Sequence, residues 1–111
     1  MRRRRALPPL VKHDDEAQAI FQALVQQWKK ETCFMSSMTR RIEHPAYQAI
    51  IRMGEQAISP IMRALEEKPD HFGPALYAIT GARPVPKEDA GKVDRIAAAW
   101  LQWARENGYR W

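Results

Sequence analysis

The chain contains one cysteine, Cys33, only five glycines among its 111 residues, and no long apolar run. A single cysteine cannot form an internal disulfide, so a reducing cytoplasm is the expected location. Charged residues and prolines interrupt every apolar stretch well before the roughly 20 residues that a membrane-spanning helix needs. Because Pro8, Pro9 and Lys12 follow the basic N-terminus, we expect no secretory signal.

No segment alternates apolar and polar residues in the manner of a half-buried strand, which argues against a sheet. Apolar residues make up 45% of the chain and charged residues 28%, a balance typical of a globular protein. We therefore predict an all-α protein, a compact bundle of four to five helices. Residues 1–13 are expected to form a basic, flexible arm because Pro8 and Pro9 disfavour helix there. Residues 14–111 are expected to form a single domain.

Apolar residues recur at spacings of three and four after the arm, which predicts a first helix through about residue 30. Asp14 or Asp15 is expected to begin it, since acidic side chains cap free backbone N–H groups there. Residues 31–43 are less regular and fit either a loop or a short helix. The predicted apolar face of the first helix consists of Ala17, Ile20, Phe21, Leu24, Val25 and Trp28.

Prolines and glycines mark the boundaries of the later helices. Pro45 is expected to begin the second helix, with His44 just outside it. The third is expected over residues 55–67, with Pro60 in its first turns. Asp70 is expected to cap a fourth helix, and a fifth is expected from Lys87 or Asp89 to Glu106. The predicted stops are Gly54, Gly81 and Asn107–Gly108.

Residues 45–81 resemble a HEAT-type repeat, in which a glycine precedes an Ala-Ile-x-Pro start of one helix and a second helix follows a short turn. The matching positions here are Gly54, Ala57, Ile58 and Pro60. The resemblance implies HEAT-like helical hairpins in a compact bundle, since a solenoid needs several stacked repeats. The chain also resembles a group of small bacterial proteins of uncharacterised activity, through the segments HPAYQAII, ALYAITG, RPVP and AWLQWARENGY.

The net charge of +5 raises the question of nucleic-acid binding. Four of the 18 basic residues are Arg2, Arg3, Arg4 and Arg5, and without them 14 basic residues face 13 acidic ones. The arm is thus either a solvated terminus or a phosphate-binding tail. As the alternative function, we predict a nucleic-acid-associated regulator, antitoxin-like or a mobile-element accessory protein. The predicted contacts are Arg2, Arg3, Arg4, Arg5, Arg40 and Arg41.

No motif in the sequence predicts an enzyme. No serine stands in a nucleophile elbow, and there is no phosphate loop or dinucleotide fingerprint. The adjacent His13 and Asp14 would point about 100° apart on a helix, so they do not converge on one metal ion. We therefore predict neither a cofactor nor a catalytic or metal site.

The preferred function is a non-enzymatic protein-interaction module, a small helical adaptor or accessory protein. Tyr109 and Trp111 lie beyond the last helix and are expected either to fold back or to project as interface anchors. His44 and His71 each stand beside a helix start, so stacked hairpins could bring them to one end of the bundle. These four residues are the predicted protein interface.

Overall fold

The computed structural model of the protein describes residues 8–111, with side chains from residue 15 onward. Over this range all regular structure is helical, which confirms the all-α bundle. It has six α-helices, and the one beyond the expected five is α2, in the segment that fitted either a loop or a short helix. The elements are α1 (Pro8–Thr32), α2 (Met38–Glu43), α3 (Pro45–Arg52), the 3₁₀ turn η1 (Gly54–Ala57), α4 (Ile58–Glu67), α5 (Gly73–Thr80), the 3₁₀ turn η2 (Lys87–Asp89) and α6 (Val93–Glu106).

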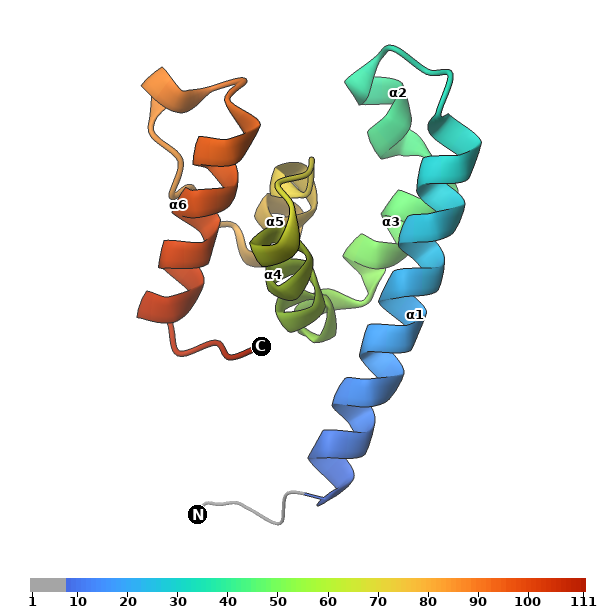
Figure 1. Ribbon diagram of the computed structural model, residues 1–111, viewed down its shortest axis with the longest axis vertical. Coiled ribbons are helices and arrows are strands. Elements are labelled where there is room, and N and C mark those ends of the chain that lie inside the picture. Colours follow the sequence, from blue (N-terminus) through green and yellow to red (C-terminus); the bar gives the residue numbers. More distant parts are fainter. Residues whose placement is uncertain (1–7) are drawn as a thin grey trace.

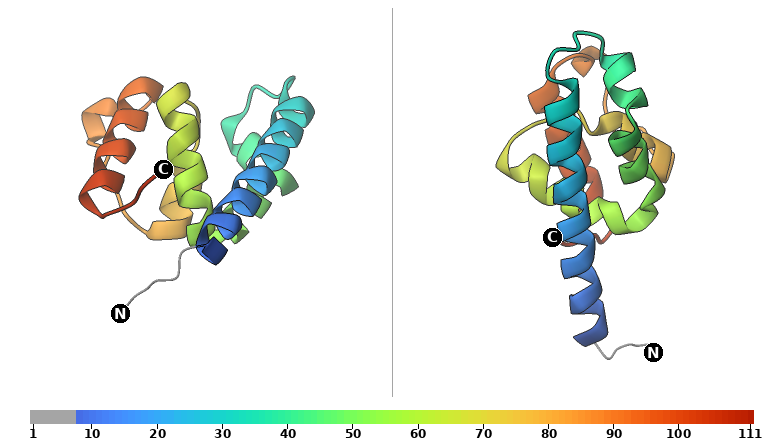
Figure 2. Two further views of the ribbon diagram at one scale, coloured as in Figure 1. Left: turned by 60° about the horizontal axis from the view of Figure 1, so that its bottom comes forward. Right: turned by 90° about the vertical axis from the view of Figure 1, so that its right-hand side faces the viewer.

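Helices α1 and α6 form opposite sides of the molecule, and α4 and α5 lie between them (Figure 1). Helix α1 packs mainly on α3, α3 on α5, and α4 on α6. Figure 2 shows α1 projecting beyond the rest of the bundle at its N-terminal end. The HEAT-like pairing of these helices stays a prediction.

The predicted start of the first helix is wrong, because α1 begins at Pro8 rather than at Asp14 or Asp15. The backbone of residues 8–13 is therefore helical and does not belong to an extended arm. Proline is tolerated in the first turn of a helix, where its missing N–H would have had no partner in any case. The acidic pair lies inside the helix and cannot cap it. Residues 1–7 lie outside the described range.

The inner face of α1 is centred on Trp28, which is 0% exposed. The Trp28 ring centroid lies 5.0 Å from that of Tyr47 and 6.0 Å from that of Phe72. Its indole N–H donates a hydrogen bond of 2.7 Å to the Arg41 carbonyl, so α2 is tied to α1. One residue of the predicted face is misplaced, since Ile20 is 53% exposed.

The predicted boundaries of α3 are confirmed. Pro45 is its first residue, and the Nδ1 atom of His44 accepts a hydrogen bond of 3.0 Å from the Ala46 N–H. After the helix, Gly54 has a φ of 66°, a left-handed conformation that suits glycine. The chain therefore turns there into η1 and α4.

Helix α5 is capped differently from the prediction, because Asp70 lies two residues before its N-cap, Phe72. One Asp70 oxygen accepts from the His71 N–H, and the other pairs with the ammonium of Lys29 on α1. Burial opposes ionisation of this carboxyl group, but the hydrogen bonds from Lys29 and His71 outweigh it and lower the pKa of Asp70. Asp70 therefore joins α1 to the loop before α5.

The cap of α5 comes from Tyr47 on α3, 28 residues earlier in the chain. Its hydroxyl accepts a hydrogen bond of 3.1 Å from the Ala75 N–H and donates one of 2.9 Å to the His71 carbonyl. Burial raises the pKa of Tyr47, the bond from Ala75 acts against this, and the Asp70 carboxylate adds to the rise. The hydroxyl therefore keeps its proton and can fill both roles.

The last helix begins later than predicted, at Val93. Residues Lys87–Asp89 form the separate turn η2, and Gly91, with a φ of 81°, lies between η2 and the helix. The predicted stop at Asn107–Gly108 is confirmed, since Asn107 is the C-cap. Over the described range, no helix combines the length and the apolar composition that crossing a membrane requires.

Candidate functional site

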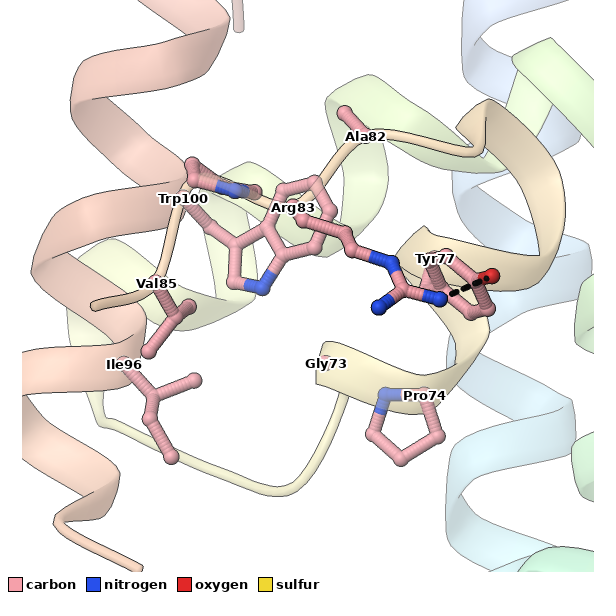
Figure 3. A pocket seen from close by; sticks show the side chains of 9 residues that line it. Gly73, Pro74, Tyr77, Ala82, Arg83, Val85, Ile96 and Trp100 are labelled. Atoms are coloured by element: carbon pink, nitrogen blue, oxygen red, sulfur yellow. Dashed lines mark hydrogen bonds between the residues drawn. The ribbon is translucent and has the colours of Figure 1, made fainter. Parts of the chain in front are cut away.

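An apolar groove lies between α5, the segment from Ala82 to Val85, and α6 (Figure 3). Its volume is about 340 Å³, and it is open to solvent. This size falls at the lower end of the range for ligand pockets. The residues that line it are Gly73, Pro74, Tyr77, Ala82, Arg83, Pro84, Val85, Ile96 and Trp100.

The end of α5 sets the position of one wall of the groove. Gly81 has a φ of 74°, and its N–H donates a hydrogen bond of 2.7 Å to the Tyr77 carbonyl. The Thr80 hydroxyl donates to the Leu76 carbonyl and accepts from the Ala82 N–H, at 2.7 and 3.1 Å. Together these bonds reverse the chain, so the following segment runs back beside α5 to face α6.

The walls of the groove are mainly apolar. Val85 and Ile96 are half-buried and pack against the core, and Pro74 is exposed at the start of α5. Gly73 contributes no side chain, and a Cβ built there would lie 3.6 Å from both the Ile96 Cγ2 and the Trp100 Nε1 atoms. The missing side chain therefore leaves the indole nitrogen of Trp100 accessible from the groove.

Arg83 and Tyr77 form the polar edge of the groove. The Arg83 guanidinium carbon lies 4.8 Å from the centroid of the Tyr77 ring, and one of its nitrogens donates a hydrogen bond of 2.8 Å to the Tyr77 hydroxyl. Such a stacked cation is held in place without being neutralised. Within the described part of the chain, no carboxylate lies within 4.0 Å of the Arg83 guanidinium.

Two predicted nucleic-acid contacts, Arg40 and Arg41, lie in different environments although they are neighbours on α2. The Arg41 guanidinium carbon lies 5.2 Å from the Trp28 ring centroid, and the Arg41 Nε atom is buried without a hydrogen-bond partner among the described residues. Arg40 is exposed, and its backbone N–H donates to Ser37, the N-cap of α2. The remaining predicted contacts, Arg2 to Arg5, lie outside the described range.

The two predicted interface histidines are held by different partners. The Nε2 atom of His44 lies 2.8 Å from a carboxylate oxygen of Glu31, while its Nδ1 atom caps α3. His71 is exposed, and among the described residues only its backbone groups take part in hydrogen bonds, with Asp70 and Tyr47. Over residues 15–111, no hydrogen bond joins the two imidazoles, and no three His, Cys, Asp or Glu side chains lie together as metal ligands.

The aromatic tail folds back against the bundle. The Tyr109 ring stacks on Trp103 at 5.6 Å, and its hydroxyl donates to a Glu55 carboxylate oxygen at 3.0 Å. The Ser59 hydroxyl donates a hydrogen bond of 2.6 Å to the Arg110 carbonyl. Trp111 lies 5.4 Å from the Arg105 guanidinium carbon. Both predicted anchors, Tyr109 and Trp111, are half-buried and therefore stabilise the fold in addition to any contact with a partner.

Deletion of residues 109–111 is therefore expected to lower the free energy of unfolding by about 1–2 kcal/mol, because a stacked aromatic pair and two exposed hydrogen bonds, to Glu55 and from Ser59, are lost. Urea denaturation of the two forms measures the difference. The substitution Gln102→Ala on the exposed side of α6 serves as a control and should change stability little. Equal stability of the truncated and full-length chains would show that the tail does not pack in solution.

Sequence reasoning missed two residues of the groove, because Arg83 and Trp100 were not among the predicted site residues. The signals that could have found them are the RPVP segment and the tryptophans of the last helix.

Comparisons with protein-family models, with curated proteins and with solved structures find no match for this chain.

Proposed function

We propose that this protein is a non-enzymatic interaction module that binds a peptide segment of a partner protein in the groove between α5, Ala82–Val85 and α6. The observation that supports this most is the apolar lining of an open groove whose edge carries a stacked, unneutralised arginine. The predicted tail and His44 support it less, because they already have partners within the bundle, and the exposed His71 lies outside the lining of the groove.

The size and chemistry of the groove suit a side-chain anchor. A volume of about 340 Å³ accommodates one or two apolar side chains of a partner. Filling such a pocket removes apolar surface from water at about 25 cal/mol per Å², and anchors of this kind carry most of the binding energy in many interfaces. The half-buried Val85 and Ile96 provide the apolar contact on two sides.

The alternative function, a nucleic-acid-associated regulator, stays a prediction. Arg41 supports it weakly, because its guanidinium lies on the Trp28 ring. The alternative therefore depends on Arg40 and on the arginines outside the described range. It predicts binding to DNA or RNA that falls steeply with added salt and is lost when Arg2 to Arg5 are replaced.

The test of the groove is selection of a random peptide library displayed on phage, with Val85→Lys as the blocking variant. A lysine at this wall is expected to fill the groove with its long side chain and to weaken the selected peptides by about tenfold, the loss of one modest anchor. Val93→Lys is the matched control, since Val93 is also half-buried but lies outside the lining.

Circular dichroism and thermal unfolding establish that both variants fold. Peptides that bind the wild type and Val93→Lys but not Val85→Lys would support the proposal. A library that yields no binder, or binders indifferent to Val85→Lys, would contradict it. Binding of the protein to DNA or RNA that is lost after nuclease treatment would instead favour the alternative.

A further inference from the structure

We infer that the groove recognises a peptide segment in which a carboxylate side chain stands near a bulky apolar one. The inference rests on the proposed function and adds the chemistry of the partner. It follows from two hydrogen-bond donors, on Trp100 and Arg83, that face the open middle of an otherwise apolar groove (Figure 3).

The first donor is the indole N–H of Trp100. This side chain is only 3% exposed, yet none of the hydrogen bonds formed within residues 15–111 involves its N–H. Trp28 is the contrasting case, since its N–H donates to the Arg41 carbonyl at 2.7 Å. Among the described residues, the one buried side-chain polar atom without a partner is the Arg41 Nε, so the Trp100 nitrogen is not sealed in the core and reaches solvent through the groove. In Trp100 the nitrogen points into the groove, where an acceptor on a bound molecule can reach it.

The second donor is the Arg83 guanidinium. Stacking on Tyr77 and one hydrogen bond to its hydroxyl fix the position of the group. The guanidinium has five N–H donors in all, so others remain free to bind an acceptor. A charged acceptor gives the strongest hydrogen bond and often binds an arginine through two oxygens. A carboxylate is therefore the acceptor that fits best.

The charge of the lining points the same way. Among the lining residues, Arg83 is the one charged side chain and none is acidic. The hollow on the other side of Pro84 differs, since its lining includes Asp89, Arg95 and Glu106, and the first two form an ion pair. Of these two neighbouring hollows, the groove is therefore the one with a net positive edge, and electrostatic complementarity selects partners of opposite charge.

The groove favours a peptide over a small free acid because it is open to solvent. Small-molecule sites bury most of the ligand surface, whereas a peptide needs only its anchoring side chains covered. The apolar walls from Pro74, Val85 and Ile96 would take a leucine or phenylalanine side chain, and the two donors would take the carboxylate of a nearby aspartate or glutamate.

The test uses blocked hexapeptides that contain one leucine and one aspartate, separated by no, one or two alanines, each paired with the same peptide carrying asparagine. Binding is followed through the four tryptophan indole N–H signals in ¹H–¹⁵N correlation spectra. The Trp100 signal is assigned by its loss in Trp100→Phe. Because the Trp28 N–H is already bonded within the bundle, its signal provides an internal reference.

The best aspartate peptide is expected to move the Trp100 signal, to leave the Trp28 signal in place, and to bind about tenfold more tightly than its asparagine counterpart, the ratio that one charge-assisted hydrogen bond supplies. Arg83→Gln should abolish this preference. Arg52→Gln, which removes an exposed arginine of α3 that does not line the groove, should preserve it.

Two results would overturn this inference and leave the proposed function intact. One is equal binding of aspartate and asparagine peptides. The other is a Trp100 signal that does not move although peptides whose binding is lost in Val85→Lys still bind. A stronger response to free 3-phenylpropionate than to any peptide would overturn it in favour of a small-molecule site. Absence of any peptide sensitive to Val85→Lys would overturn both proposals.

Discussion

Replacement of Trp28 by alanine is expected to lower the free energy of unfolding by about 3–5 kcal/mol, the range for truncating a buried tryptophan. Trp28 is fully buried and contacts two other helices and the loop before a third. Its ring lies against Tyr47 of α3 and Phe72 before α5, and its N–H holds the Arg41 carbonyl of α2. The substitution therefore leaves a cavity and also removes a hydrogen bond.

A loss of this size is a large part of the 5–15 kcal/mol that stabilises a typical domain. Urea denaturation followed by circular dichroism measures it. Trp111→Ala is the matched control, because this tryptophan is half-buried and its ring faces Arg105 at the surface. Equal losses for the two variants would contradict the central position of Trp28.

Removal of the Tyr47 hydroxyl by Tyr47→Phe is expected to cost about 2–4 kcal/mol, although no carbon atom is lost. The hydroxyl satisfies both the Ala75 N–H at the start of α5 and the His71 carbonyl before it. A phenylalanine would leave the buried Ala75 N–H and the part-buried His71 carbonyl without their partner, and an unpaired buried group costs about 1–3 kcal/mol.

Tyr77→Phe is the control for this substitution, since Tyr77 is 44% exposed and its hydroxyl accepts a hydrogen bond from the exposed Arg83 at the surface. Its expected effect lies within about 0.5 kcal/mol. Amide hydrogen exchange gives a second readout, because the Ala75 amide should exchange faster in Tyr47→Phe. A cost no larger than that of Tyr77→Phe would show that water replaces the hydroxyl.

The parts of the fold that the sequence predicts correctly depend on local chemistry. Pro45 begins a helix because its missing N–H has no role in a first turn, and Gly81 ends one because it adopts a positive φ. Helical spacing likewise identified Phe21 and Trp28 as core residues. In each case the residues that decide the structure lie within one or two turns of one another.

The errors arise where the structure is determined by contacts between residues far apart in the sequence, or by the special chemistry of the first turn of a helix. Pro8 was expected to exclude helix, but a proline at the first position is compatible with it. The cap of α5 comes from Tyr47, which no local pattern connects to Ala75. Ile20 follows the helical pattern and is still exposed, because nothing in the described part of the chain covers it.

The groove could not be predicted for the same reason. Its three walls come from α5, the RPVP segment and α6, and only their packing leaves the Trp100 nitrogen facing open space. A tryptophan in an apolar helix stripe gives no sign of whether its N–H is satisfied. Likewise, the sequence does not show that the Arg83 guanidinium has no carboxylate beside it in the described part of the chain, because this depends on where the fold places the acidic residues.

Proline in the Ala82–Val85 wall limits the main-chain hydrogen bonds that this wall can form with the backbone of a bound peptide. Pro84, which lines the groove, has no backbone N–H, and Pro86 interrupts the same chain segment just beyond the lining, so this wall cannot offer the regular row of main-chain donors that pairing with an added strand requires. Recognition would then depend on the side chains of the peptide and hardly on its amide groups. Peptides with N-methylated backbones, which resist proteases, are consequently suitable starting points for inhibitors of this surface.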